Sequence, residues 1–368
     1  MGSSKVITLI PGDGVGPEIA EVAKSCISAL DVDIEWDVQE AGSAVIAKEN
    51  VPLPERVIDS IRKNKVALKG PVETPIGKGF RSINVQLRQK LDLFANVRPC
   101  KFYDGVHSRI TNPQDINIVI VRENTEDLYA GIEFMEACGL DNPFLKFLQE
   151  QKGVELDCDT GLSIKPISVK ASERIGIFAF EYARRYGRKK VSAVDKANIM
   201  KYSDGLFMKT VESVSQKYPD IAYEHKLVDN MCMQLVQYPE KYDVLVLPNL
   251  YGDIISDLAA GIVGGLGVAP GANMGEDYAV FEAVHGSAPD IAGKDMVNPT
   301  GLLLSTVLML EHLGEMDAAK RLEQAVATVL KEGKHVTADL KGKDSPEPPV
   351  GTCAMGEAIV EKIHSMGN

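Results

Sequence analysis

The sequence predicts an α/β protein built around a largely parallel sheet. Short runs of β-branched and other apolar residues alternate with helical stretches along much of the chain, which is typical of βαβ units. The composition agrees, because 45% of the residues are hydrophobic and 25% are charged, as in ordinary globular proteins. At about 100–200 residues per domain, a chain of 368 residues is expected to form about two domains.

The predicted elements follow one another in a regular order. Strands are expected where the apolar runs are short, at 6–10, 117–121, 190–194 and 242–248. Helices are expected at 17–30, 198–217, from Gly252 onward, 302–313, 317–331 and 356–364. The segment 130–167 breaks the pattern, because glycine, asparagine and aspartate interrupt its apolar pieces. We interpret it as an excursion from the sheet, an arm that contacts a second subunit.

The charge balance bears on the partners of the chain. Forty Lys and Arg residues against 52 Asp and Glu residues give a formal net charge of −12, which argues against general nucleic-acid binding. The basic residues gather once, at Arg81, Arg88, Arg98 and Arg122. The longest uncharged run, 258–275, contains six glycines and a proline, so we expect a packed or ligand-facing turn there and no membrane span.

The start of the chain and its cysteines predict a reducing compartment. The first five residues lead straight into the apolar run 6–10, so no signal peptide or transit helix is expected. The six cysteines show neither a CxxC motif nor a metal-ligand spacing; they are Cys26, Cys100, Cys138, Cys158, Cys232 and Cys353. We therefore expect reduced thiols in a cytoplasmic protein, although a processed mitochondrial enzyme would show the same pattern.

The first candidate motif is the glycine-rich turn 12–18, between a predicted strand and a predicted helix. It resembles a dinucleotide fingerprint, but its spacing is G-x-G-x-G and not G-x-G-x-x-G. Pro17 suits the first turn of a helix. We therefore favour a structural strand-to-helix turn over a dinucleotide site.

Two carboxylates follow the predicted strand 242–248. If a helix starts near Gly252, Asp253 and Asp257 are four residues apart and project from one face. That face lies at the carboxyl edge of the sheet, where ligands tend to bind. Oxygen ligands of this kind suit Mg²⁺ or Mn²⁺. The alternative is that Asp253 caps the helix and Asp257 is solvated.

Three arginines from two nearby regions predict an anion site. The guanidinium groups of Arg88, Arg98 and Arg122 could pair bidentately with carboxylates, and Ser82 and Asn84 add a hydroxyl and an amide to the same stretch. Taken singly, an ordinary surface or salt-bridged arginine is the simpler interpretation. Together with the aspartate pair, the three arginines indicate an anionic, metal-chelated substrate.

Two residues are candidates for proton transfer. Lys196 follows the predicted strand 190–194, and a lysine that is desolvated or beside a metal-bound alcohol can act as a base. Tyr129 is the nearby phenol that could deliver a proton. The alternatives are a solvated lysine and a tyrosine that serves packing.

The segment 284–299 is the candidate cofactor loop. Its small residues let the backbone approach a ligand, and His285 can stack or form a hydrogen bond. Asp290 would accept a hydrogen bond from a ribose hydroxyl and repel a 2′-phosphate. A glycine- and proline-rich surface loop is the alternative.

Considered together and in this order, these motifs resemble those of the metal-dependent β-decarboxylating dehydrogenases, the isocitrate/isopropylmalate dehydrogenase family. The resemblance runs from about residue 5 to the C-terminus and is strongest to the NAD-dependent isocitrate dehydrogenases. The motifs that carry it are 12–18, 82–88, 98–99, 122–125, 196–198, 249–257 and 285–293.

The resemblance implies an isocitrate/isopropylmalate dehydrogenase-like fold and not a GxGxxG Rossmann fold. Its expected parts are a large cofactor-binding domain (1–95 and 264–368), a small dimerisation domain (96–128 and 170–263) and a clasp-like arm (129–169) that pairs subunits. Two features depart from the family pattern. Asp127-Leu128 stands where many relatives have Gly-Glu, and 136–158 is longer than expected of the mitochondrial subunits, which leaves clasp pairing and dimer versus tetramer open.

The resemblance also implies roles for single residues. The substrate carboxylates would be held by Ser82, Asn84, Arg88, Arg98 and Arg122. A divalent metal would be held by Asp253, Asp257 and Asp229, the last donated across the dimer interface. Lys196, donated in the same way, would be the base, and Tyr129 the acid. NAD would contact Thr74, His285, Gly286, Ser287, Ala288, Pro289, Asp290, Ile291 and Asn298.

The implied activity is oxidative decarboxylation of isocitrate to 2-oxoglutarate and CO₂ with reduction of NAD, by a homo-oligomer that binds neither nucleic acid nor membrane. Ser82 and Asn84 can hydrogen-bond a third carboxylate, where an isopropylmalate enzyme would need apolar contacts. Homoisocitrate is the nearest rival, because one methylene is worth only about 1–3 kcal/mol. Asp290 and Ile291 favour NAD, since NADP-using relatives tend to carry a cation and an aromatic residue there. A non-catalytic regulatory subunit is the alternative of another class.

Overall fold

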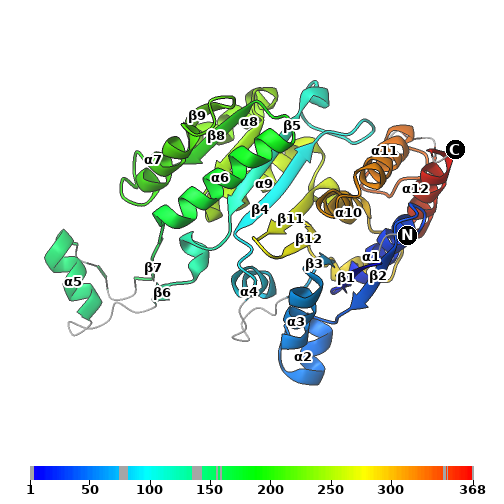
Figure 1. Ribbon diagram of the computed structural model, residues 1–368, viewed down its shortest axis with the longest axis horizontal. Coiled ribbons are helices and arrows are strands. Elements are labelled where there is room, and N and C mark those ends of the chain that lie inside the picture. Colours follow the sequence, from blue (N-terminus) through cyan, green and yellow to red (C-terminus); the bar gives the residue numbers. More distant parts are fainter. Residues whose placement is uncertain are drawn as a thin grey trace.

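The computed structural model describes residues 4–73, 82–134, 143–154, 156–157, 160–342, 345 and 347–366. A ten-stranded sheet in the order β2-β1-β3-β12-β11-β4-β5-β10-β8-β9 runs through the molecule (Figure 1). Its strands are β1 (Lys5–Ile10), β2 (Ile34–Val38), β3 (Val66–Lys69), β4 (Ala95–Lys101), β5 (Asn117–Glu123), β8 (Lys190–Asp195), β9 (Ala222–Leu227), β10 (Val244–Leu247), β11 (Pro270–Met274) and β12 (Ala279–Ala283).

The sheet has two parallel flanks and an antiparallel centre. β2, β1, β3 and β12 are parallel to one another, and so are β5, β10, β8 and β9. β11 pairs antiparallel with both β12 and β4, and β4 pairs antiparallel with β5. The prediction of a largely parallel sheet is therefore confirmed, but it did not anticipate the antiparallel centre. β4 leads into β5 through 102–116 without a helical crossover, and such a return makes neighbouring strands antiparallel.

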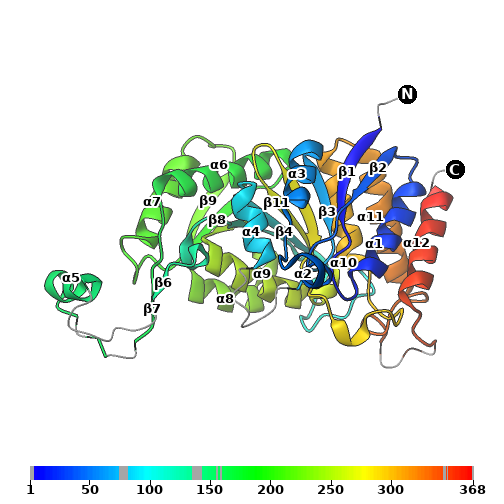
Figure 2. The ribbon, with the colours of Figure 1, turned by 90° about the horizontal axis from the view of Figure 1, so that it is seen from below.

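The helices cover both faces of the sheet (Figure 2). They are α1 (Gly16–Ser28), α2 (Ser43–Glu49), α3 (Glu55–Asn64), α4 (Ile83–Lys90), α5 (Pro143–Lys152), α6 (Val169–Arg185), α7 (Asp204–Ser215), α8 (Val228–Gln237), α9 (Asn249–Val263), α10 (Thr300–His312), α11 (Met316–Glu332) and α12 (Thr352–Met366). α7 begins six residues later than predicted, because turns occupy much of 197–203. α9 begins three residues before Gly252, so Asp253 lies inside the helix and does not cap it.

The two faces of the sheet carry different cores. On one face, here called the continuous face, residues such as Leu9, Val97 and Val246 form one hydrophobic cluster with α1, α6, α7, α10, α11 and α12. On the opposite face, here called the divided face, there are two clusters: Val280 packs with α3 and α4, and Leu245 packs with α8 and α9. On the divided face, the two hydrophobic cores are therefore separated by a region of the sheet, the interval, where polar side chains can lie.

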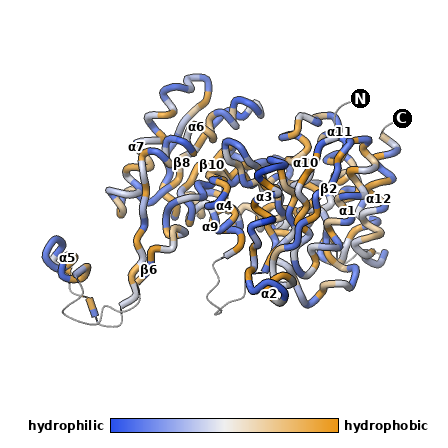
Figure 3. Tube along the Cα trace, turned by 60° about the horizontal axis from the view of Figure 1, so that its bottom comes forward, coloured by the Kyte–Doolittle hydropathy of each residue, from blue (hydrophilic) through white to orange (hydrophobic). Residues whose placement is uncertain are grey.

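The irregular segment forms an arm that extends from the body of the molecule (Figure 1). It contains a two-stranded antiparallel sheet, β6 (Glu133–Phe134) and β7 (Leu162–Ser163), and the helix α5. α5 carries both apolar and polar residues (Figure 3) and buries none of them. Among its side chains, Phe147 is 56% exposed. Phe144 of α5 stacks on Phe134 at 5.5 Å, while Phe147 adds apolar surface that the described residues leave exposed.

The two ends of the chain meet on one flank, where α12 packs against α1 and α11. Within the described residues, no helix combines the length and apolar character needed to cross a membrane.

Candidate active site

Polar side chains fill the interval between the two cores of the divided face. Successive strand residues point to opposite faces, and in the central strands one set is apolar and joins the continuous face. The other set includes apolar residues of the two smaller cores, such as Val280 and Ile120. It also includes the polar residues Lys69 of β3, Glu282 of β12, Asn273 of β11, Asn96 and Arg98 of β4, and Arg122 of β5. Because these strands are neighbours in the sheet, their polar residues converge on one site.

Arg122 is the buried centre of this site, with only 1% of its surface exposed. Its Nε and Nη2 donate to Asn249 Oδ1 at 2.9 and 2.7 Å, and its Nη1 pairs with Asp253. Gly252, between those two residues on α9, has no room for a side chain, because a Cβ there would lie 2.5 Å from Arg122 Cγ. The helix thus approaches Arg122 through a glycine and fixes the guanidinium with the residues on either side.

Two more predicted residues join Arg122 at this point. Tyr129 donates from its hydroxyl to Asp253 Oδ2 at 2.5 Å, and its ring lies under the Arg122 guanidinium at 4.7 Å. Arg98 Nη1 donates to Asp257 Oδ1 at 3.2 Å, and Arg98 Nη2 lies 3.5 Å from Asp253 Oδ1. The structure therefore brings together both aspartates of α9, two of the arginines and the tyrosine that the sequence singled out.

The third arginine belongs to a buried network beside this cluster. Arg88 Nε donates to Asn273 Oδ1 at 3.1 Å, and its Nη2 lies 3.7 Å from Glu282 Oε1. Glu282 also pairs with Lys69 at 2.5 Å, and Asn273 Oδ1 accepts from Asn96 at 2.9 Å. Sequence reasoning missed the partners of Arg88. The available signal was a polar residue within an otherwise apolar buried strand, as in the VALK of β3 and the AVFEA of β12.

A cavity of about 130 Å³ opens onto these groups, with Asn84, Arg88, Arg98 and His285 in its lining. Four buried polar atoms of that lining have no hydrogen-bond partner in the described part of the chain: Asn84 Oδ1, Asn96 Oδ1, Arg98 Nε and His285 Nε2. Buried polar groups are normally paired, so these atoms fit a polar ligand. Ser82 precedes α4 on the exposed surface, while Arg81 and Thr74 lie outside the described residues.

The charges of the cluster shift the pKa values of its members. Burial and then the charge of Arg88 lower the pKa of Arg122 to about 10. Burial opposes ionisation of Asp253, but Arg122, Tyr129 and Arg98 outweigh it, so the pKa of Asp253 is lowered. Burial, together with the hydrogen bond to Asp253, raises the pKa of Tyr129. At neutral pH the site therefore combines cations, a carboxylate and a protonated phenol.

Lys196 and Asp229 form a pair of their own. Lys196 directly follows β8 and Asp229 lies in the first turn of α8, and their Nζ and Oδ1 atoms are 2.5 Å apart. Within the described residues, no three His, Cys, Asp or Glu side chains stand close enough to hold one metal ion. Asp229 is therefore not gathered with Asp253 and Asp257 in a single chain.

A buried ion network that sequence reasoning missed supports both proton-transfer candidates. Lys165 Nζ lies 2.6 Å from Asp204 Oδ1 and 3.7 Å from Asp127 Oδ1, and both carboxylates are fully buried. Asp204 accepts from the backbone N–H of Lys196 at 2.8 Å. Asp127 accepts from the N–H of Leu250, in α9, at 2.8 Å. Asp127 also begins the short helix η2 (Asp127–Ala130), which carries Tyr129.

The backbone conformation of Asp127 explains how aspartate replaces the glycine that the family resemblance implies at this position. Asp127 has a φ of +68°, in the left-handed region where glycine is most easily accommodated. Many relatives have glycine there. Aspartate is among the residues that tolerate this region, and its carboxylate caps the N–H of Leu128 at 2.8 Å.

The candidate cofactor loop lines a second cavity, of about 570 Å³. Five of the candidate cofactor residues border it, namely His285, Gly286, Ala288, Ile291 and Asn298. His285 also lines the smaller cavity, so it joins the two. Burial lowers the pKa of His285. Asp339, which accepts from Asn298 Nδ2 at 3.0 Å, and Gly267 border the same cavity and were missed.

The remaining loop residues lie beside this cavity. Asp290 is exposed within the short turn η5 (Pro289–Ile291), and Ser287 is buried and donates to Glu73. The Ser287 carbonyl accepts from the N–H of Val15 at 2.9 Å. A Cβ at Gly14 would lie 2.0 Å from that same carbonyl oxygen. The glycine-rich turn therefore packs against the chain's own backbone, as a structural turn would.

Comparison with known proteins identifies the family and the fold of the chain. The sequence model of the family described as isocitrate/isopropylmalate dehydrogenase matches residues 6–359, so the chain belongs to that family. The crystal structure of isocitrate dehydrogenase from Methylococcus capsulatus has a TM-score of 0.87 and 48% identity, over 98% of this chain and 99% of that chain. The predicted family and fold are thereby confirmed.

Two relatives show the range of names within the family. A mitochondrial NAD isocitrate dehydrogenase regulatory subunit from Dictyostelium discoideum is 50% identical over 340 residues, covering 92% of this chain and 88% of the relative. Chloroplastic 3-isopropylmalate dehydrogenase from Solanum tuberosum is 48% identical over 328 residues, covering 89% and 85%. Membership in a dehydrogenase family therefore leaves the substrate to be decided by the site.

Proposed function

We propose that this chain catalyses the oxidative decarboxylation of isocitrate to 2-oxoglutarate and CO₂ with reduction of NAD. The observation that carries the proposal is that Arg98 and Arg122 both contact Asp253, while Arg88 lines the same small cavity as Arg98. Isocitrate has three carboxylates, and planar guanidinium groups are the side chains best suited to pair with them. The name of the Dictyostelium relative, an NAD isocitrate dehydrogenase subunit, supports the same substrate and cofactor.

The small cavity suits the substrate's polar groups. Arg98 Nε and Asn84 Oδ1 are buried there without partners within the described residues. We propose that Arg98 donates to a substrate carboxylate and that Asn84, together with Ser82, hydrogen-bonds the third one. A branched alkyl group would leave those polar atoms unpaired, and an unpaired buried polar group costs about 1–3 kcal/mol. This argument favours isocitrate over 3-isopropylmalate.

The proton-transfer steps fall to Tyr129 and Lys196. The raised pKa of Tyr129 keeps its hydroxyl protonated at neutral pH, so the phenol can donate a proton to the substrate carbon that loses its carboxylate. In this structure the hydroxyl donates its one proton to Asp253 at 2.5 Å. Donation to the substrate therefore requires that Asp253 be released from this bond, as it would be if its carboxylate held a cation. Lys196 would accept the proton of the substrate hydroxyl, from an active site shared between two chains, while NAD accepts the hydride.

The residues present fit a divalent cation. Asp253 and Asp257 offer oxygen ligands on one face of α9, and the Asp257 side chain is 56% exposed and accessible. When bound there, Mg²⁺ or Mn²⁺ would act as a Lewis acid toward the substrate's hydroxyl and carboxylate oxygens. We propose Asp229 of a second copy as a further ligand, since a single chain does not supply a third carboxylate among the described residues.

We propose a homo-oligomer with shared sites, and the surface around Lys196 and Asp229 supports this proposal. Large apolar residues are exposed nearby in sequence, notably Tyr202 at 90%, Ile199 at 69% and Val236 on α8. Together with the uncovered arm, these residues form the kind of apolar surface that marks subunit interfaces. The comparisons support oligomers of some kind, because the name of the Dictyostelium relative is that of one subunit of a larger enzyme.

The direct test is NADH formation by the purified chain. We expect turnover of isocitrate that requires Mg²⁺ and stops with a chelator, with a higher kcat/KM than for homoisocitrate or 3-isopropylmalate. A preference for 3-isopropylmalate would overturn the assignment of Ser82 and Asn84. If the chain alone showed no turnover but a partner subunit restored it, the result would favour the alternative that the chain is a non-catalytic regulatory subunit.

The cofactor preference has its own test. Asp290 is exposed on the loop beside the large cavity, and Ile291 lines it. Because a carboxylate repels a 2′-phosphate, we expect NAD to be preferred over NADP. The double variant Asp290→Lys with Ile291→Tyr should narrow or invert the preference. An unchanged ratio of kcat/KM values would show that another segment selects the cofactor.

The chain's thiols support a reducing compartment. Cys26, Cys100, Cys232 and Cys353 are free, as expected in the cytoplasm or in the mitochondrial matrix. We propose a cytoplasmic location. Recovery of the chain in the mitochondrial fraction of the source cells would contradict this location.

A further inference from the structure

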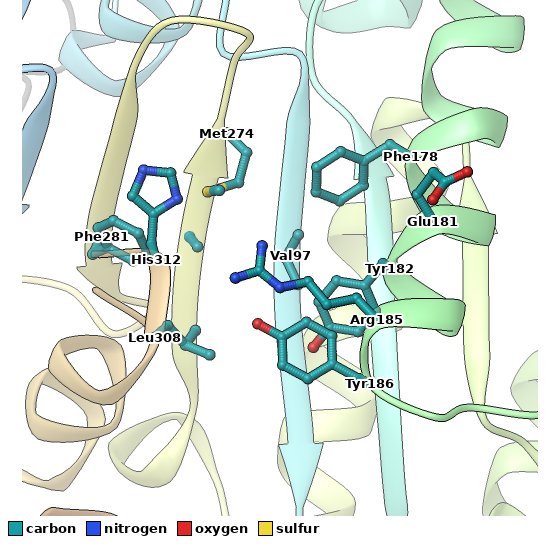
Figure 4. A pocket seen from close by; sticks show the side chains of 11 residues that line it. Val97, Phe178, Glu181, Tyr182, Arg185, Tyr186, Met274, Phe281, Leu308 and His312 are labelled. Atoms are coloured by element: carbon teal, nitrogen blue, oxygen red, sulfur yellow. The ribbon is translucent and has the colours of Figure 1, made fainter. Parts of the chain in front are cut away.

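A cavity of about 230 Å³ lies on the continuous face, behind the substrate-facing side chains (Figure 4). Its floor includes Val97 of β4, Met274 of β11 and Phe281 of β12. The residues next to these in sequence, such as Arg98 and Asn273, point to the divided face. We call this space the back cavity. It shares strands with the candidate active site but none of its side chains.

The walls of the back cavity are largely flat and apolar. Phe178, Tyr182 and Tyr186 follow one another at intervals of four on α6 and its C-terminal end, and their rings stack at 6.5 and 4.4 Å. Leu308 of α10 lies on the opposite wall (Figure 4). The Tyr186 hydroxyl donates to Glu311 of α10 at 3.0 Å and ties the two walls together. Stacked rings of this kind suit a planar aromatic group.

A single cation without an acidic partner points into this space. Figure 4 shows the Arg185 guanidinium directed into the cavity between the two walls. Its charge acts on Glu311, the partner of Tyr186, but among the described residues no carboxylate lies within the 4.0 Å of an ion pair. Its neighbour Arg184 is different, because it pairs with Asp220 at 2.9 Å and lies 3.9 Å from Glu181 on the cavity rim. The rim carboxylate is thus shared with Arg184, and Arg185 remains available for an anion.

We propose that the back cavity binds a small planar aromatic anion, such as an aryl carboxylate, with the ring between the α6 aromatics and Leu308 and the carboxylate on Arg185. A volume of about 230 Å³ is below the roughly 300–1,000 Å³ of pockets for drug-sized ligands, so the ligand has one ring or two fused rings. Because the cavity lies on the other face of the sheet, this ligand and the substrate can be bound at the same time.

The test uses naphthalene-2-carboxylate and its neutral analogue naphthalene-2-carboxamide, with binding to the full chain measured by calorimetry. We expect Arg185→Gln to weaken carboxylate binding by about tenfold, which corresponds to 1.4 kcal/mol, and to leave carboxamide binding unchanged. Arg184→Gln is the matched control, since it removes the neighbouring guanidinium that is already paired. It should leave the affinity for both compounds unchanged, and saturating isocitrate should displace neither.

Four results would overturn the proposal. The first is no binding of the carboxylate to the wild-type chain, and the second is an equal loss in Arg184→Gln and Arg185→Gln. The third is displacement by isocitrate, which would put the compound in the active site. A further variant, Leu308→Trp, should fill the cavity and abolish binding of both compounds. Retained binding in that variant, with an unchanged melting temperature, would move the site elsewhere.

Discussion

Gly252 offers a sharp test of how α9 builds the site. A Cβ at this position would lie 2.5 Å from Arg122 Cγ and 2.6 Å from Arg122 Cβ. These atoms are close to the backbone of β5, so the arginine cannot avoid the contact by moving only its tip. Overpacking of this kind costs about 1–3 kcal/mol. The variant Gly252→Ala should therefore displace the Arg122 guanidinium from Asn249 and Asp253.

The size of the effect on activity follows from the hydrogen bond to the substrate that a displaced Arg122 would lose. A hydrogen bond to a charged group is worth about 1.5–3 kcal/mol, so kcat/KM for isocitrate should fall by roughly 10- to 150-fold. The matched control is Gly261→Ala on the same helix, where no atom lies within 4 Å of the added Cβ. There the gain in helix propensity, about 1 kcal/mol, should appear as added stability with unchanged kcat/KM.

The assay is steady-state NADH formation together with urea unfolding of both variants, with the oligomeric state checked by light scattering. If Gly252→Ala kept the wild-type kcat/KM, Arg122 would not be held in place by α9 in the way described. Equal stabilisation of the two variants would refute the close approach of α9 to Arg122.

Three further predictions concern other parts of the site. Lys165→Met should lower the free energy of unfolding by about 3–5 kcal/mol, because it leaves buried carboxylates without their cation. As a control, Lys170→Met at an exposed position should change the free energy of unfolding by less than about 0.5 kcal/mol. Equal effects of the two variants in urea titrations would show that the buried network does not stabilise the fold. Tyr129→Phe should lower kcat by roughly 10²–10⁴-fold with little change in KM, and an unaltered kcat would remove the phenol from proton transfer. Burial opposes ionisation of Glu282, but Lys69 and Arg88 outweigh it and lower the pKa of Glu282 from 4.5 to about 2. The ionised Glu282 therefore stabilises the folded chain above pH 4.5, and this contribution is lost as the pH falls toward 2. Unfolding free energies between pH 2 and 6 should decline less steeply in Glu282→Gln than in the wild-type chain, and parallel curves would contradict the shift.

The sequence predicted those parts of the site that depend on local spacing. Asp253 and Asp257 share a helix face because four residues make about one turn, and the motif order was enough to associate them with Arg98 and Arg122. The helix start was misplaced by three residues, and the true start at Asn249 excludes capping by Asp253. Spacing within one element was therefore a sound guide, while element boundaries were not.

The remaining parts depend on contacts between distant segments, which no local pattern reveals. Lys165 looks like an ordinary lysine until the fold encloses it between Asp127 and Asp204. Glu282 and Lys69 pair across β12 and β3, whose adjacency depends on the strand order. The antiparallel centre of the sheet was missed for the same reason, since alternation of strands and helices does not report where the chain turns back without a helix.

The most direct measurement is a crystal structure of the chain with isocitrate and Mg²⁺. We predict that the substrate carboxylates contact Arg88, Arg98 and Arg122, and that the ion is held by Asp253, Asp257 and a carboxylate from a second copy. Isocitrate bound elsewhere, or an ion held away from α9, would contradict it.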